Sequence, residues 1–206
     1  MLEFNALTLA LEDYPHQRPL SLLLRKGQGV MVVGSNKRAL HVLVSTLLGR
    51  RPMAQGKVLW RGEEFTGKAA AFFRCMVAYI PPVMAEKDTT VESVLAGLNR
   101  LHHHKSVATS QQERMQEWAR IGLSPAIASQ SVASLSLECW QLLLVAEARL
   151  KHKKIVVIEE VVSPRVTEQL QQLMKEEGCV VVATTMDEAM ASVFDKYIML
   201  DESLNN

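Results

Sequence analysis

Hydrophobic residues along this chain follow two patterns, short apolar runs and longer stretches with helical spacing. The short runs predict strands over residues 2–10, 19–24, 30–33, 76–80, 153–158, 179–183 and 197–200, with a further short strand between turns in 55–62. The helical spacing predicts helices over residues 35–49, 91–98, 111–121, 138–150, 164–176 and 187–193. Strands that alternate with helices imply a mainly parallel sheet with helices on both faces.

The segment from Val83 to Ala133 has a helical pattern of apolar residues and is more polar than its surroundings. We therefore expect one domain over residues 1–206, in which 1–82 and 134–206 form an α/β core and 83–133 form an inserted helical subdomain.

Composition narrows the class of protein. The chain has 206 residues, 48% of them hydrophobic, and a net charge of +1, so nothing in its overall charge favours binding to nucleic acid. The three cysteines are far apart, which favours free thiols over disulfides or a zinc site. No apolar run approaches the roughly 18 residues of a membrane span. We expect a cytoplasmic protein that does not insert into a membrane and reaches its inner face through a partner.

Metal binding is not expected either. His102, His103 and His104 are consecutive, so on a helix their side chains point in different directions, and no cysteine or acidic cluster lies beside them in the sequence. A solvated helix end explains them better, and no residue is assigned as a metal ligand.

The richest candidate for chemistry is the strand, turn and helix that begin at Val30. A phosphate-binding P-loop has this context and reads G-x-x-x-x-G-K-[ST]. Here the eight positions are Gly34, Ser35, Asn36, Lys37, Arg38, Ala39, Leu40 and His41. Ala39 stands at the second glycine, Leu40 at the lysine and His41 at the hydroxyl that binds Mg²⁺, so the groups that grip a triphosphate are missing.

The order of the segments resembles the nucleotide-binding subunit of ABC (ATP-binding cassette) proteins over nearly the whole chain. The resemblance is carried by LRKGQGVMVVGSN, LLGRRPMAQGKVLWRGE, VAYIPP, SLSLECWQ, IVVIEEVVSP and VVVATTMDEAM, in that order. It implies a P-loop NTPase-like α/β fold, with an ABC-type mainly parallel sheet core, N-terminal antiparallel strands and an inserted helical subdomain. By the same resemblance, Tyr14 would stack on adenine.

The other family motifs also depart from the family pattern. Pro82 stands at the Q-loop glutamine, and Thr185 stands at the switch histidine. In the signature motif Ser136 remains, but Leu137 and Glu138 replace the two glycines. In the family this motif faces the γ-phosphate that is bound by the other subunit. The negative charge of Glu138 would repel that phosphate. These residues match nucleotide-binding positions, but we expect them to be vestigial.

The acidic pair after the strand 153–158 is the best preserved motif. Glu159 stands at the Mg²⁺-linked aspartate and Glu160 at the catalytic glutamate. Without the P-loop groups, we expect Glu160 to cap the strand end or pair with a cation rather than act as a catalyst. Lys37 and Arg38 could still reach an anion, although two solvated basic residues at a helix start are the simpler interpretation.

The leading hypothesis is a catalytically degenerate subunit, a pseudo-ATPase, that serves as a structural or regulatory part of an ABC-like membrane complex. Its partners would be a transmembrane subunit, contacted by residues 82–100, and a second ABC ATPase subunit, identical or different. No cofactor is certain; ATP or ADP stays open as a weakly bound ligand that does not need Mg²⁺.

Two alternatives remain open. The first is a divergent, slow ABC ATPase that binds ATP through Lys37 and Arg38, stacks adenine on Tyr14 and uses Glu160. The second is a soluble homodimeric scaffold or adaptor that works without a transporter.

Overall fold

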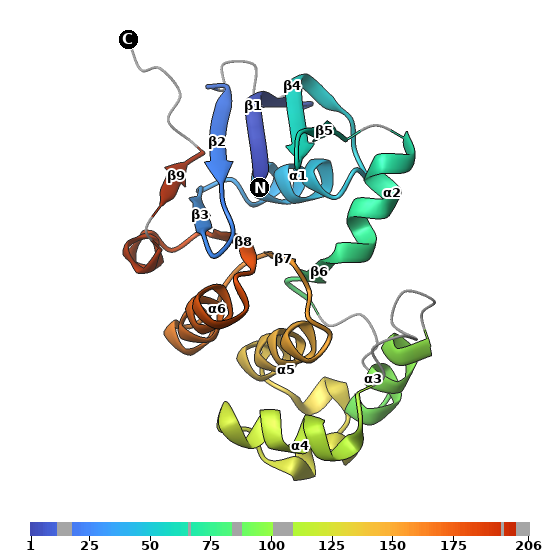
Figure 1. The fold of residues 1–206 in the computed structure, drawn as a ribbon. Helices are drawn as coiled ribbons and strands as arrows, with labels where there is room; N and C mark the ends of the chain where they lie inside the picture. The colour runs from blue at the N-terminus through green and yellow to red at the C-terminus, as the bar shows by residue number, and fades with distance from the viewer. Residues whose placement is uncertain (12–17, 66, 84–87, 101–108, 195, 201–206) are drawn as a thin grey trace.

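The molecule is built of stacked layers of sheet and helix (Figure 1). The computed structural model describes residues 1–11, 18–65, 67–83, 88–100, 109–194 and 196–200. Tyr14 and the three histidines 102–104 therefore lie outside the described residues. Among the described residues, no helix has both the length and the apolar character needed to cross a membrane.

The central sheet is parallel throughout. Its five strands are β3 (Gly29–Val33), β6 (Val77–Ile80), β7 (Ile155–Ile158), β8 (Val180–Thr185) and β9 (Tyr197–Met199), in the spatial order β6-β7-β8-β3-β9. Every residue of β3, β7 and β8 is buried, as their continuous apolar runs predict for strands covered on both faces. Because all five strands run the same way, their carboxyl ends meet at one edge.

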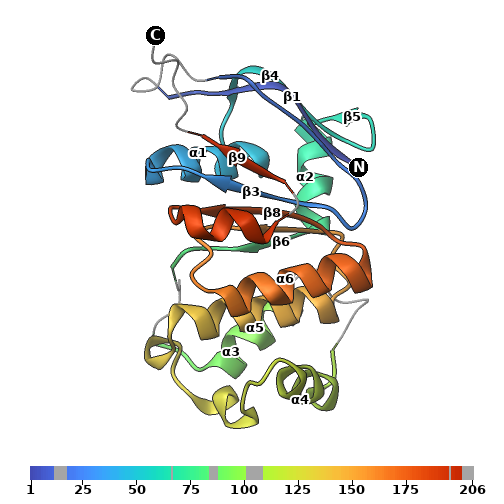
Figure 2. The same ribbon diagram turned by 90° about the vertical axis from the view of Figure 1, so that its left-hand side faces the viewer.

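Alternate residues of β3 serve two separate cores. Val30 and Val32 pack into a cluster with the N-terminal strands and α1 (Lys37–Leu47), whereas Met31 and Val33 pack into a cluster with α5 (Leu137–Leu150) and α6 (Pro164–Glu177). Figure 2 shows α1 between the two sheets, and α5 and α6 on the opposite face of the parallel sheet. The period of two in a strand makes this division possible.

The second sheet is antiparallel, with the order β2-β1-β4-β5, and consists of β1 (Leu2–Leu9), β2 (Leu20–Leu24), β4 (Met53–Trp60) and β5 (Glu63–Glu64). The predicted turn at Gln55 and Gly56 is wrong, because both residues lie within β4. Gly56 (φ 86°) sits where the pairing with β1 shifts register, and a Cβ there would lie 2.2 Å from the carbonyl oxygen of Ala6. The glycine permits a bulge rather than a turn.

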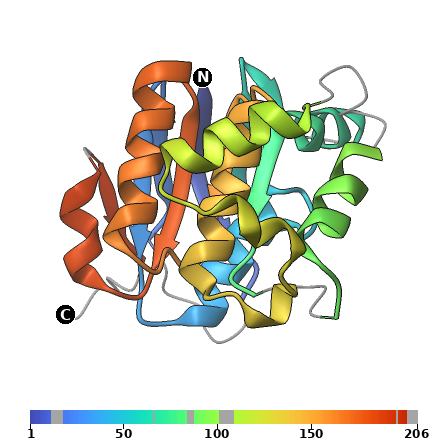
Figure 3. The same cartoon turned by 90° about the horizontal axis from the view of Figure 1, so that it is seen from below.

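The polar helical segment forms the far end of the molecule. It contains α3 (Val91–Arg100), α4 (Gln111–Arg120) and the 3₁₀ turns η2 (Pro125–Ser129) and η3 (Val132–Ser134). Figure 3, viewed from that end, shows α4 lying across α5. The helices predicted over residues 91–98 and 111–121 are confirmed as α3 and α4. The division into an α/β core and a helical subdomain stays a prediction.

Two further elements differ from the sequence-based expectation. Helix α2 (Gly67–Met76) is absent from the sequence-based prediction, although its buried residues Ala70 and Phe73 lie three positions apart, as on one face of a helix. The helix expected over 187–193 is the 3₁₀ helix η4 (Glu188–Val193). Asp187 caps it through a hydrogen bond from the Ala189 N–H, a local turn that favours the tighter helix.

Candidate functional site

Four of the predicted motif segments begin at the carboxyl edge of the parallel sheet. The Gly34 N–H, directly after β3, donates to the Thr185 carbonyl at the end of β8, 3.2 Å away. The Glu159 N–H, directly after β7, donates to the Ile80 carbonyl at the end of β6, 3.0 Å away. Pro82 follows β6 and is half-buried. The topology therefore brings together segments that are far apart in the sequence.

The N-terminus of α1 is closed by its own side chain. Asn36 is the N-cap, and its Oδ1 accepts a hydrogen bond from the Ala39 N–H at 3.1 Å. A helix N-terminus can bind an anion because its first N–H groups lack partners. Here a phosphate would have to displace the Asn36 side chain to reach the Ala39 N–H. The neighbouring Ser35, Lys37 and Arg38 are exposed.

The next two positions of the degenerate P-loop belong to the core. Ala39 is 0% exposed and Leu40 is 1% exposed, and both pack in the apolar cluster between the two sheets. The second-glycine and lysine positions of the family pattern are thus occupied by side chains that stabilise the packing of α1. Leu40 supplies no charge to the edge of the sheet, as its residue type predicts.

His41 lies in the first turns of α1, and its side chain contacts Glu159, which directly follows β7. Its Nδ1 lies 2.7 Å from Glu159 Oε1, and the Tyr79 hydroxyl donates to Glu159 Oε2 at 2.8 Å. Glu159 is only 2% exposed, so each oxygen of a buried carboxylate has a protein partner. Burial, followed by the bond to Glu159, raises the pKa of Tyr79 well above its ordinary value of 10.0.

Glu160 is held in an unusual backbone conformation. Its φ is 55°, a left-handed value that is uncommon for a residue with a side chain. The Gln141 Nε2 donates to the Glu160 carbonyl at 2.7 Å, and the Glu160 N–H donates to Thr184 Oγ1 at 3.1 Å. The Lys37 Nζ forms an ion pair with Glu160 Oε1 at 2.6 Å. Both carboxylates of the acidic pair therefore face a side chain from α1.

The residues at the signature-motif positions lie at the start of α5 and form contacts within the protein. Ser136 is the N-cap of α5 and accepts a hydrogen bond from the Cys139 N–H at 3.1 Å. Glu138 pairs with Arg165 of α6 at 3.0 Å, and Leu137 is half-buried. Within the described part of the chain, these contacts join α5 to α6 and do not reach the P-loop residues.

Thr185, at the position of the switch histidine, forms a hydrogen bond with the backbone of its own turn. It is 2% exposed, and its Oγ1 accepts a hydrogen bond from the Asp187 N–H at 3.1 Å. This bond shapes the turn that leads into η4. A threonine buried in this way cannot supply a positive charge to the edge of the sheet.

Two residues at the edge were given no role from the sequence. Tyr79 binds Glu159, and Gln141, which is 0% exposed, bridges the Glu160 carbonyl and the Val162 N–H. A tyrosine within an otherwise apolar strand and a glutamine within an apolar helix were the available signals, since buried polar groups need partners.

These residues do not fit Mg²⁺-ATP in the manner of the P-loop pattern. The Mg²⁺ position would lie between His41 and Glu159, which bind each other directly. Among the described residues, no group of three or more histidine, cysteine, aspartate or glutamate side chains could hold a metal ion.

Comparison with known proteins gives a consistent picture of the fold. No protein-family model matches the chain. An uncharacterised ABC transporter ATP-binding protein from Haemophilus influenzae is 22% identical over 213 residues, which cover 98% of this chain and 81% of that protein.

Solved structures agree over nearly the whole length. A proposed ABC transporter ATP-binding protein from Pyrococcus furiosus superimposes with a TM-score of 0.76 at 16% identity, covering 98% of both chains. A proposed metal-chelate type ABC transporter in an inward-facing conformation gives 0.72 at 20% identity, covering 98% of this chain and 80% of the other. A dimeric ATP-binding cassette in a post-hydrolysis state, bound to ADP and phosphate, gives 0.70 at 16% identity, covering 97% and 94%. The predicted resemblance and fold class are confirmed.

Proposed function

Because this chain has the fold of the ATP-binding subunits of ABC transporters, we propose that it is a non-hydrolysing subunit of such a complex. It would act as a structural or regulatory component and not as a motor. Its partners would be a transmembrane subunit and a second cassette subunit, and its place would be the cytoplasmic face of the membrane.

The direct contact between His41 and Glu159 carries this proposal. In a working site, Mg²⁺ lies between the P-loop hydroxyl and the acidic residue after the strand. Here the imidazole and the carboxylate are 2.7 Å apart, and the second carboxylate oxygen accepts from Tyr79. A metal ion would have to break a contact to a buried carboxylate before it could bind.

The second carboxylate supports the same conclusion. Glu160, at the position of the catalytic glutamate, pairs with Lys37. A general base must be free to accept a proton from water. The Lys37 ammonium group lies 2.6 Å from Glu160 Oε1, so a water molecule would have to displace it to reach that oxygen.

The test is to measure ATP binding and phosphate release by the purified full chain, with and without Mg²⁺. We expect no Mg²⁺-dependent binding and no phosphate release above the buffer rate, in the wild type and in Glu160→Gln alike. Magnesium-dependent turnover that Glu160→Gln abolishes would contradict the proposal and favour the slow ATPase.

We further propose that residues 82–100 contact the transmembrane partner. The described part of this segment contains α3, whose Glu92 and Arg100 are exposed and whose Val91 and Leu95 are buried. The helix is thus anchored by one face and presents charged residues on the other.

Charge reversal tests this surface in cells that contain the whole complex. The double variant Glu92→Lys with Arg100→Glu should lower the fraction of the protein that sediments with membranes. The matched control is Glu168→Lys with Lys175→Glu, two exposed positions on α6 whose reversal also leaves the net charge unchanged. Unchanged membrane recruitment of the α3 double variant would rule out this surface. The proposal that the protein does not hydrolyse ATP would be unaffected by that result.

A further inference from the structure

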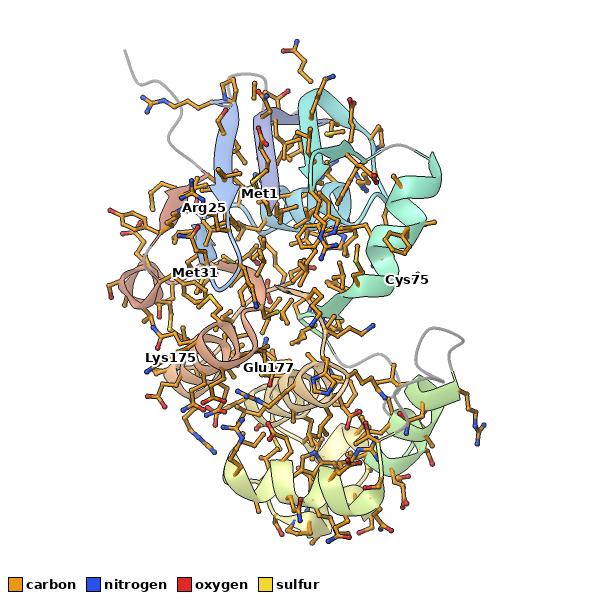
Figure 4. The ribbon with its side chains drawn as sticks, viewed as in Figure 1. Met1, Arg25, Met31, Cys75, Lys175 and Glu177 are labelled. Carbon is orange, nitrogen blue, oxygen red and sulfur yellow. The ribbon has the colours of Figure 1, made fainter. Side chains whose placement is uncertain are left out.

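A half-enclosed cavity is lined in part by Tyr79 and by neither residue of the acidic pair. Its volume is about 350 Å³, and it lies between the end of α2, strand β6, and helices α3 and α5. Figure 4 marks Cys75, at the end of α2 on this side of the molecule. The apolar part of the lining includes Val77, Ile80, Leu98 and Leu144. Its size falls at the lower end of the range for small-molecule pockets, roughly 300–1,000 Å³.

Four basic side chains surround this apolar lining. They come from three places in the chain: Arg50 after α1, Arg74 on α2, and Lys151 and Lys153 after α5. The one acidic residue of the lining, Glu147, is bound by Arg114 through Nε at 2.6 Å and Nη2 at 3.2 Å. The carboxylate of Glu147 is thus already compensated by a fifth cation.

The hydrogen-bond and ring partners of the four cations are neutral, although Glu147 also attracts Lys151 electrostatically. Lys151 donates to the Asn99 side chain, Lys153 to the Cys75 carbonyl at 2.7 Å, and Arg74 to the Leu48 carbonyl at 3.3 Å. The Arg50 guanidinium stacks on the Tyr79 ring, 4.9 Å from its centroid. In the described part of the chain, none of the four forms an ion pair with a carboxylate.

Lys151 is the most deeply buried of the four cations. It is only 7% exposed, and among the described residues its ammonium group, which has three donors, has one side-chain acceptor, Asn99. Burial lowers the pKa of both Lys151 and Lys153. Arg50 and Arg74 are exposed, whereas Lys151 is buried and Lys153 is half-buried. The two lysines repel each other, and an anion placed between them would relieve that repulsion.

We propose that this cavity binds a small organic anion that joins a carboxylate or phosphate group to a short apolar body. The anionic group lies among Lys151, Lys153 and Arg74, and the apolar body lies against Ile80, Leu98 and Leu144. The bound molecule contacts Tyr79, whose hydroxyl holds Glu159. Neither the P-loop residues nor residues of the acidic pair line the cavity.

Calorimetric titration of the full chain with octanoate, octyl phosphate, octanol and octylammonium tests the proposal. The first two separate a carboxylate ligand from a phosphate ligand, while the last two share the apolar chain and lack the negative charge. We expect saturable binding of octanoate or octyl phosphate, and binding at least about tenfold weaker for octanol and octylammonium.

Variants locate the site. Lys151→Met and Lys153→Met should each weaken the anion about tenfold. Lys175→Met, at an exposed position on α6 that Figure 4 shows on the opposite side from Cys75, should leave the affinity unchanged. Should Lys151→Met fail to fold, Lys153→Met and Arg74→Met decide the question. Equal binding of all four probes, or unchanged affinity in the lysine variants, would overturn the proposal. So would binding of a glutamate-rich peptide without binding of either anion, which would indicate a protein partner.

Discussion

His41 Nδ1 lies 2.7 Å from Glu159 Oε1, and this contact joins two residues that are 118 positions apart in the chain. It fastens the first turns of α1 to the carboxyl end of β7. His41 remains about half exposed, whereas Glu159 is buried, so the contact reaches from the surface to the interior. The contact with His41, together with the one from Tyr79, compensates the burial of the Glu159 carboxylate.

Tyr79→Phe should destabilise the fold, because Glu159 Oε2 loses its donor while the ring remains. We expect the free energy of unfolding to fall by about 1–3 kcal/mol. Urea denaturation followed by circular dichroism measures the difference. Tyr197→Phe is the matched control, since Tyr197 is 60% exposed and should change stability by less than about 0.5 kcal/mol. Equal stabilities of both variants would mean that the Glu159 contact is weak.

The same tyrosine predicts a dependence of stability on alkaline pH. Its pKa is raised in the folded protein, so above pH 10 the unfolded chain loses the phenol proton before the folded one does. Stability from this group is complete below pH 10 and falls as the pH rises further, by about 1.4 kcal/mol per pH unit. The wild type should therefore lose stability more steeply than Tyr79→Phe above pH 10. Parallel stability curves would contradict the assigned role of Tyr79.

Leu40→Lys restores the residue type of a working P-loop but should not restore nucleotide binding. Leu40 is 1% exposed in an apolar cluster, so the lysine would bring a charge into the core. We expect a loss of about 3 kcal/mol or more in the free energy of unfolding. Leu40→Met, which conserves volume, should cost less than about 1.5 kcal/mol. A stable lysine variant that binds ATP would show that the position faces the site after all.

Arg114→Met should weaken the attachment of α4 to α5. Arg114 and Glu147 are both largely buried, and removal of the arginine leaves a buried carboxylate without its partner. The expected loss is about 3–5 kcal/mol, measured by urea denaturation. The surface pair Lys57 and Glu64 offers the control, because Lys57→Met should change stability by at most about 1 kcal/mol.

Hydrogen exchange distinguishes how that loss is distributed. If Arg114 fastens α4, the amides of α4 should exchange faster in Arg114→Met while those of β7 and β8 stay protected. Uniform acceleration throughout the chain would indicate general destabilisation and no specific role in holding α4.

The fold could be predicted from the sequence where burial is uniform. The runs Val30–Val33 and Ile155–Ile158 are apolar throughout, and a strand covered on both faces has that pattern. The turn predicted at Gly56 is wrong, because a glycine is typical of both a turn and a bulge. Which of the two forms here depends on pairing with Ala6, which is distant in the sequence. In helix α2 the buried residues Ala70 and Phe73 have helical spacing, but two positions are too few to predict a helix from the sequence.

The site could be predicted only in part. Residue types alone reveal that Leu40 and Thr185 cannot supply the charges that a nucleotide site needs. They do not reveal that Leu40 packs in the core, that His41 meets Glu159, or that Lys37 meets Glu160. Each of these contacts depends on which strand lies beside which, and the order of strands in a sheet is set by the tertiary fold.

The Asn36 side chain, which closes the N-terminus of α1, has a consequence for regulation. Because this side chain already occupies the Ala39 N–H, a bound anion gains less from this helix end than from an uncapped one, and ligand concentration adds less to the folding equilibrium. Under the proposed function, the surface offered to a partner would stay constant while the adenylate pool of the cell rises and falls. Assembly with this subunit would then be independent of metabolic state, and any response to energy supply would have to come from the other cassette.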